Sequence, residues 1–211
     1  GGVISPVGLT GASMQLFSHG VITGLLFLLV GVAYERVHTR HIPDLGGLIS
    51  RMPITGIAFI IAGLASLGLP STSGFISELL VFLGTFPVWS WLTALGVFGI
   101  VITSGYILWT IQRVFFGPNR ERFSQLGDAS ISDYIPIATL VVSIMIIGLY
   151  PSLLTDVFRE GLDPIIESLK LNGPFVGSWM GIKRILKCHP VRWLGGGDGF
   201  DPPKKIKLRK F

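Results

Sequence analysis

Residues 70–86 read PSTSGFISELLVFLGTF, and this stretch decides how the chain can fold. It opens with the helix breaker Pro70 and three hydroxyl residues, and a Gly-Thr-Phe-Pro run interrupts it again at its end. Between these interruptions lies one carboxylate, Glu78, among apolar side chains. An acid at membrane depth costs roughly 2.5–3.5 kcal/mol, so it normally faces a cavity or a partner. Glu78 is therefore the first candidate for chemistry, provided that the chain lies in a membrane.

Composition indicates a membrane protein. Hydrophobic residues make up 49% of the 211 residues and charged residues only 14%, against about 25% charged in soluble domains. Mean hydropathy is +0.65. The apolar residues form long blocks. Some blocks reach the roughly 20 residues that a helix needs to span a bilayer, and others are shorter. We expect an all-α membrane protein with about five transmembrane helices, one of them discontinuous, from these blocks: Met14–Tyr34, Ile54–Leu69, Phe75–Phe86, Val88–Ile111 and Tyr134–Leu154.

The third block is too short to span alone, and its interruptions coincide with the acid. Irregular backbone at membrane depth is tolerated only where protein or a water-filled cavity surrounds it. Short hydrophobic segments broken by Gly and Pro are the best sequence pointer to a transport site. The position of the break within residues 70–87 stays open. The alternative is a set of ordinary lipid-facing helices without chemistry.

Two histidines are further candidates. His19 shares a predicted helical face with Gln15 and Thr23, and its imidazole titrates near neutral pH, so it can take and give a proton. A hydrogen bond between helices explains it equally well. His38 lies in a charged helix end, Glu35–His41, where an interfacial role is the commoner explanation.

Charge divides the chain into a predicted transmembrane part, residues 1–170, and a basic tail, residues 171–211. The first part holds 8 Lys and Arg against 10 Asp and Glu, and the tail 9 against 2. Apolar residues recur at helical spacing in the tail around Trp179, which is typical of a basic amphipathic helix in the membrane interface. The Lys204–Lys210 cluster favours anionic lipid as its partner. Nucleic-acid binding is less favoured, because no recognisable module accompanies the charge.

Several classes of site find no support in the sequence. The single cysteine, Cys188, excludes an internal disulfide framework. No phosphate loop, nucleotide fingerprint or nucleophile–base pair is present. Because the chain opens on Gly1, we expect a fragment of a longer protein. Catalysis would then be transport chemistry, or would belong to partner subunits.

Three motifs resemble one family: QLFSHG at 15–20, LLVGVAYERVHTRHIPDLGG at 28–47 and ASLGLPSTSGFISE at 65–78. They are similar to the antiporter-like proton-pumping subunits of NADH:quinone oxidoreductase, respiratory complex I, and most similar to its M-type or chain-4-type subunit. The resemblance covers about residues 11–169. It implies the last five helices of a subunit with two inverted repeats, each containing a broken helix and a buried titratable residue.

The resemblance also implies roles for single residues. Glu78 matches the family's glutamate on the second broken helix, and His19 and His38 match histidines of its hydrophilic axis. Supporting polar residues would be Ser18, Ser71, Thr72 and Ser73, the last three lining the break and holding water beside Glu78. The family's lysines and its first-repeat glutamate would lie upstream of Gly1, so this chain would hold half of a proton channel at most.

Cofactors and partners follow from the same resemblance. NADH, FMN, iron–sulfur clusters and quinone would belong to partner subunits, leaving none in this chain and no metal. The partners would be other membrane subunits of the complex, and the expected location is the bacterial plasma (inner) membrane, as a multi-pass protein. A sodium/proton antiporter from the related family is the alternative.

The tail resembles a different protein. Gly177-Ser178-Trp179, Cys188-His189-Pro190 and Gly199–Pro202 are similar to the C-terminal half of the membrane protein insertion efficiency factor. A fusion near residues 170–173, natural or through joined reading frames, would explain this. A role in membrane insertion through the tail is therefore a second alternative.

Membrane orientation is ambiguous. Two inter-helix segments carry arginines, one with Arg36, Arg40 and Arg51, the other with Arg113, Arg120 and Arg122. The positive-inside rule would place both in the cytoplasm. The resemblance implies three crossings between them, and we follow it in expecting the two segments on opposite faces.

Overall fold

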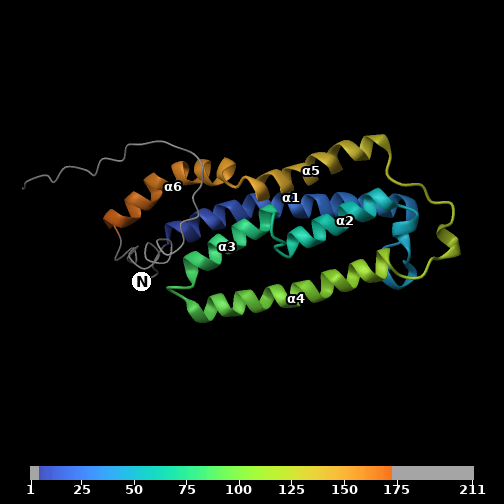
Figure 1. Cartoon of the computed structure of the whole chain (residues 1–211), viewed down its shortest axis with the longest axis horizontal. Helices are drawn as coiled ribbons and strands as arrows, with labels where there is room; N and C mark the ends of the chain where they lie inside the picture. Colours follow the sequence, from blue (N-terminus) through green and yellow to red (C-terminus); the bar gives the residue numbers. More distant parts are fainter. Residues whose placement is uncertain (1–4, 173–211) are drawn as a thin grey trace, which may run out of the picture. The chain divides into compact units, whose positions relative to one another are not determined.

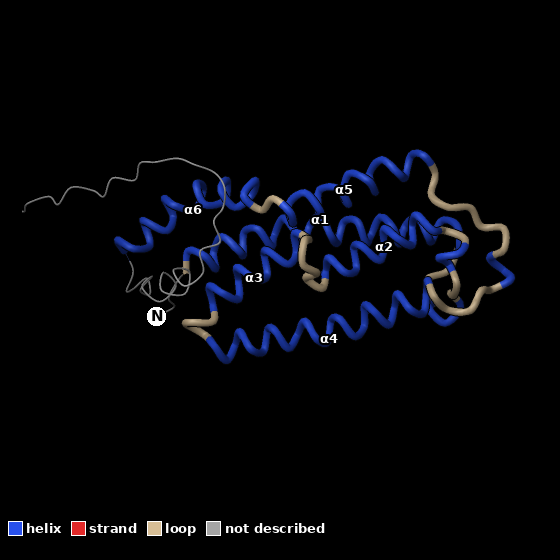
Figure 2. The backbone as a smooth tube through the Cα atoms, in the orientation of Figure 1, coloured by secondary structure: helices blue, strands red, loops and turns tan. Residues whose placement is uncertain are grey.

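The computed structural model describes residues 5–172, and Figure 2 shows only helices and connecting loops in this part. It is all-helical, without a strand in residues 5–172, as predicted. The six α-helices are α1 (Pro6–Val37), α2 (Pro53–Ser66), α3 (Ser73–Thr85), α4 (Ser90–Phe115), α5 (Ile131–Leu149) and α6 (Ser152–Asn172). The predicted amphipathic helix of the basic tail lies outside the described residues.

Three of the helices are long and apolar enough to cross a membrane: α1, α4 and α5. Helix α1 has 32 residues and begins eight residues before the predicted block. Pro6 occupies its first turn, where a missing N–H costs nothing, and the hydroxyl of Ser5 accepts from Gly8 N at 3.3 Å. It ends at His38, whose φ of 54° is left-handed and stops the helix.

Helices α2 and α3, with 14 and 13 residues, are each too short to span a bilayer. They run one after the other alongside α1, in the opposite direction (Figure 1). At the end of α3, a Cβ on Gly84 would touch the backbone of Gly8, near the start of α1. At the start of α2, Met52 and Ala58 share a core cluster with Val32, near the end of α1. The two helices are therefore halves of one interrupted crossing, and the interruption is residues 67–72.

The two arginine-bearing loops lie at the same end of the bundle, which corrects the expectation that they lie on opposite faces. The Ser50 hydroxyl donates to Asn119 Oδ1 at 3.0 Å, and the Arg120 guanidinium donates to Pro43 O at 3.0 Å. The prediction was wrong because Phe75–Phe86 does not cross separately: it completes α2. Only the interrupted helix and α4 run between the two loops, and two crossings return the chain to the same side.

A polar clamp at this end fixes where α2 begins. The Asp128 carboxylate accepts from Ile54 N at 2.7 Å and from the Thr55 hydroxyl at 2.7 Å, in the manner of an N-cap. The Asp128 carbonyl accepts from Arg36 Nε at 3.0 Å. Arg36 also forms an ion pair with Asp133 at 3.1 Å, which connects the end of α1 to the start of α5.

Helix α6 was not anticipated, because the sequence prediction ended its fifth block at Leu154. It is amphipathic and lies against α1, where its Ile166 is buried. Its acids and Arg159 recur every three or four residues, as expected for the solvated face of an interfacial helix.

Candidate functional site: the interruption between α2 and α3

The interruption is built from left-handed backbone and local hydrogen bonds. Gly68 has φ +70° and Ser71 has φ +79°, a region that non-glycine residues seldom enter. Leu69 N donates a hydrogen bond to Leu64 O at 3.1 Å. Thr72 donates two hydrogen bonds to Leu69 O, one from its N–H at 3.1 Å and one from its hydroxyl at 2.7 Å. Much of the polar backbone freed by the break is thus satisfied within the break, as membrane depth requires.

Glu78 lies beside this interruption. It is half-buried on the second turn of α3. A Cβ placed on Gly68 would lie 2.7 Å from Glu78 Oε2, so only glycine leaves room for the carboxylate in this conformation. In residues 5–172, no hydrogen bond or ion pair is formed by the Glu78 side chain. The acid therefore rests against the bent backbone with its hydrogen-bonding capacity unused by the described residues.

Helix α1 covers α3 through small and polar side chains, because the two backbones approach closely. A Cβ on Gly11 would lie 2.6 Å from Val81 N. Further along, the Ser77 hydroxyl makes a very short contact with Gln15 Oε1. One helical turn on, the buried Ser18 hydroxyl donates to Ser73 O at 3.2 Å. A polar strip between α1 and α3 therefore leads toward the interruption.

Ser73 ends this strip with an unpaired group. Its hydroxyl is buried, with 1% of the residue exposed, and no group in residues 5–172 forms a hydrogen bond with it. Unpaired buried polar atoms are rare in folded proteins, and an unobserved water is one of the ordinary explanations. The Ser73 hydroxyl thus fits a bound water at the start of α3.

His19 follows Ser18 on α1 as Glu78 follows Ser77 on α3. A helix turns by about 100° per residue, and α1 and α3 run in opposite directions, so both residues fall on the same side of the interface. The His19 side chain is exposed and forms no hydrogen bond with another residue in 5–172, while the His19 carbonyl accepts from the Thr23 hydroxyl at 2.6 Å. Within the described part of the chain, no hydrogen bond joins His19 to Glu78.

The remaining predicted residues take separate places. His38 is exposed at the far end of α1, where the first arginine-bearing loop begins, and not at the interruption. Ser71 is exposed in the interruption, and Thr72 is buried there. The Ser71 carbonyl contacts Gly148 of α5 so closely that a Cβ there would collide with it.

Sequence reasoning missed four contributors: Gly68, Ser77, Gly148 and the contact of Gln15 with α3. The spacing of Gln15 and Ser18, and of Ser73 and Ser77, at three and four residues was the available signal for facing polar residues. In residues 5–172, no group of three His, Cys, Asp or Glu side chains is placed to hold a metal ion.

Comparison with known proteins gives a consistent result. Residues 2–103 match the transmembrane family described as NADH:quinone oxidoreductase/Mrp antiporter. Subunit M of the NADH-quinone oxidoreductase of Rhodobacter capsulatus is 39% identical over 162 residues, which is 76% of this chain and 32% of that protein. A chain 4 of the NAD(P)H-quinone oxidoreductase of Synechococcus elongatus is 41% identical over 177 residues, 81% of this chain and 33% of that protein.

A solved structure agrees. A chain in respiratory complex I from Thermus thermophilus with bound NADH superposes with a TM-score of 0.68 at 29% identity, covering 74% of this chain and 34% of that one. The present chain thus spans about a third of the length of the relatives it matches. Its residues 2–103 carry the transmembrane domain of the family shared by NADH:quinone oxidoreductases and Mrp antiporters, and the chain resembles the M-type or chain-4-type subunits.

Proposed function

We propose that this chain is part of a proton-translocating membrane subunit of an NADH:quinone oxidoreductase, and that Glu78 carries the proton at the interruption between α2 and α3. The observation that supports this best is the position of the Glu78 carboxylate against Gly68, where the helix is broken. The family match indicates ion transport across the membrane, and the Glu78 carboxylate is a group that can take up and release a proton.

A charge outside the described residues would drive the change in protonation. Burial disfavours the ionised form of a carboxylate, and a nearby cation favours it. In a low-dielectric interior, moving such a cation changes the balance strongly. The arginines of residues 5–172 lie at the end of α1, in the loops after α1 and α4, at the end of α4 or on α6, and none pairs with Glu78. The switching cation would therefore come from another part of the subunit or from a neighbour.

The polar strip between α1 and α3 would conduct the proton. Hydroxyl groups both donate and accept hydrogen bonds, so they can pass a proton through bound water. The Ser77 and Ser18 hydroxyls line the way to the unpaired Ser73 hydroxyl, where a water would sit beside the break. His19, on the same side of the interface as Glu78, would relay protons laterally. Redox chemistry in partner subunits would supply the energy.

The test is Glu78→Gln in the assembled complex, reconstituted into vesicles. Gln keeps the shape of Glu but cannot ionise, so protons translocated per NADH oxidised should fall. Glu160→Gln is the matched control, because Glu160 is an exposed acid on α6, and it should leave the ratio unchanged. An unaltered ratio in Glu78→Gln would eliminate the proposed role.

Sodium transport is the second candidate, because the matched family includes Mrp antiporters. The same vesicles separate the two ions. Proton movement that is unaffected by replacing sodium with potassium supports proton transport. Translocation that requires sodium would support an antiporter instead.

A further inference from the structure

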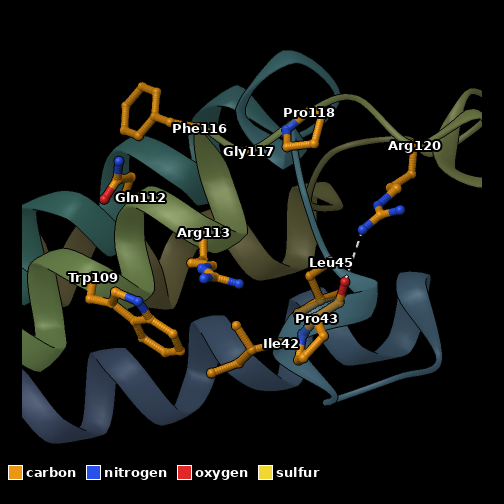
Figure 3. Close-up of a pocket in the computed structure, with 10 residues that line it drawn as sticks. All are labelled: Ile42, Pro43, Leu45, Trp109, Gln112, Arg113, Phe116, Gly117, Pro118 and Arg120. Carbon is orange, nitrogen blue, oxygen red and sulfur yellow. Dashed lines mark hydrogen bonds between the residues drawn. The ribbon is translucent and has the colours of Figure 1, made fainter.

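A second polar site lies at the end of the bundle that carries the clamp, far along α4 from the interruption. It is a cavity of about 540 Å³ between the last turns of α4 and the loop after α1. Figure 3 shows Arg113 and Arg120 with their guanidinium groups directed toward the loop that carries Pro43 and Leu45. This size lies within the range of small-molecule sites.

The cavity is positively charged. Two arginines line it, and none of its described lining residues is acidic. The nearest acids in the sequence are Asp44, which pairs with His41 at 3.1 Å, and Glu121, beside Arg120. Arg120 uses one N–H to hold Pro43 O at 3.0 Å. Arg113 stacks over Trp109 at 5.1 Å and forms no ion pair with a residue in 5–172. Most of the guanidinium donors thus remain available.

The remaining lining suits the boundary between lipid tails and headgroups. Trp109 and Phe116 are 47% and 59% exposed near the end of α4, where aromatic side chains typically sit at headgroup depth. Ile42 and Leu45 add apolar surface, and Gln112 adds an amide. Basic pockets beside transmembrane helices, with apolar surface next to them, are a recurring mode of anionic lipid recognition.

The surrounding charge favours the same ligand. Six of the eight Lys and Arg residues of positions 1–170 lie at this end of the bundle: Arg36, Arg40, Arg51, Arg113, Arg120 and Arg122. The positive-inside rule then places this end in the cytoplasm, where the anionic leaflet attracts basic groups. The C-terminus of α4 opposes an anion with a partial negative charge, but a helix end acts more weakly than two full cations.

We propose that this cavity binds the phosphodiester headgroup of an anionic phospholipid. Arg113 and Arg120 would hold the phosphate oxygens, since a guanidinium fork matches phosphate geometry. Trp109 and Phe116 would pack against the upper part of the acyl chains. The site is independent of Glu78, so its test does not depend on the proposed proton transport.

The experiment measures lipid retained by the whole 211-residue chain. The protein is purified in a mild detergent and incubated with phosphatidylglycerol or phosphatidylcholine, and lipid adducts are counted by native mass spectrometry. The double variant Arg113→Gln/Arg120→Gln is compared with Arg51→Gln/Arg122→Gln, which removes the same charge from the same end but outside the cavity. The basic tail is present in every sample, so its contribution cancels.

The expected result is phosphatidylglycerol retention that weakens by about tenfold or more in the cavity variant. The control variant should bind like the original chain, and phosphatidylcholine should not be retained. Gln112→Glu, at an exposed position, adds a negative charge to the cavity with little risk to folding, and should also repel the lipid. Circular dichroism checks that each variant is folded.

Three results would overturn the proposal. Equal losses in both double variants would mean that general charge attracts the lipid. Unchanged retention in the folded cavity variant and in Gln112→Glu would assign the arginines to another partner, such as an acidic segment of a neighbouring subunit. The third result is displacement of the lipid by inorganic phosphate at millimolar concentration, together with quenching of tryptophan fluorescence by phosphate in the absence of lipid. This result would make free phosphate the ligand.

Discussion

Helix α4 and the interrupted pair α2–α3 are two crossings of similar length that treat polar groups in opposite ways. Helix α4 is continuous over 26 residues, and most of its large apolar side chains are exposed, as for a surface that faces lipid or another subunit. The pair α2–α3 has small and polar residues, an acid and a break, and it is covered by α1 and α5. Unpaired backbone costs too much in lipid, so a broken helix is stable only where protein surrounds it.

Glycines show the same contrast. Gly99 and Gly105 on α4 have no neighbour within 4 Å of an added Cβ. On α5, a Cβ on Gly148 would collide with the Ser71 carbonyl in the interruption. The break is therefore held by close backbone contact, whereas α4 has room on those faces.

The largest stability effect is expected from Gly148→Ala. The new methyl group must push the interruption away from α5, and overpacking of this kind typically costs about 1–3 kcal/mol. Gly105→Ala is the matched control: it fills open space and gains helix propensity, so it should be neutral or stabilising by up to about 1 kcal/mol. Unfolding of both variants in micelles, followed by circular dichroism, checks this. Equal stability of the two variants would mean that the contact with Ser71 is not needed.

The second effect concerns the clamp that starts α2. Burial alone raises the pKa of Asp128, but the hydrogen bonds from the Thr55 hydroxyl and from the N–H groups of Ala129, Ile54 and Thr55 outweigh it and hold the pKa below its usual range. A depressed folded-state pKa contributes stability that is present above the unfolded value, near 4, and is lost as the pH falls through the folded value.

Asp128→Ala should therefore cost about 0.5–2 kcal/mol at neutral pH, as expected for the loss of an N-cap. The difference between the variant and the original chain should shrink below about pH 4. Denaturant unfolding at pH 7 and pH 3 measures both values. A difference that stays constant between these pH values would contradict the assignment of the cap to an ionised Asp128.

The smallest stability effect is expected from a comparison of two buried serines beside the interruption, Ser18 and Ser73. Ser18→Ala removes the hydrogen bond to Ser73 O and should cost about 0.5–1.5 kcal/mol. Ser73→Ala removes a hydroxyl that has no hydrogen-bond partner among residues 5–172 and should be nearly neutral. If the Ser73 hydroxyl holds a water on the proton route, this variant should nevertheless slow proton transfer in the assembled complex. A stable variant with unaltered transfer would remove Ser73 from the route.

The sequence predicted the membrane class, the apolar spans and the discontinuous helix, because long hydrophobic blocks and a Pro-Ser-Thr-Ser-Gly run are strong local signals. It also predicted Glu78 as the acid in the irregular segment. These features depend on composition and on short-range backbone chemistry. The motifs at 15–20, 28–47 and 65–78 also predicted the resemblance to antiporter-like subunits, and the comparisons with known proteins confirm that resemblance.

The rest depended on pairing between distant segments. Whether Phe75–Phe86 crosses alone could not be decided without knowing that α2 and α3 share one path along α1, so the prediction for the arginine loops was wrong. The contacts of Gly68 with Glu78, and of Gly148 with Ser71, join residues whose proximity follows only from packing. Helix α6 was missed because its amphipathic pattern follows directly on an apolar block.

The roles of Glu78, His19 and His38 in proton transfer stay predictions. The structure describes His19 near the interruption and His38 at the other end of α1. A route that uses both histidines would therefore need further groups between them.

The proposed role of Glu78 requires that its carboxyl group gain and lose a proton during turnover, and this can be measured directly. Infrared difference spectra of the assembled complex, recorded between its oxidised and reduced states, report carboxyl groups that gain or lose a proton. We expect a protonated-carboxyl band in the original complex that is absent in Glu78→Gln and retained in Glu160→Gln. The same band at full intensity in all three proteins would show that Glu78 does not carry the proton.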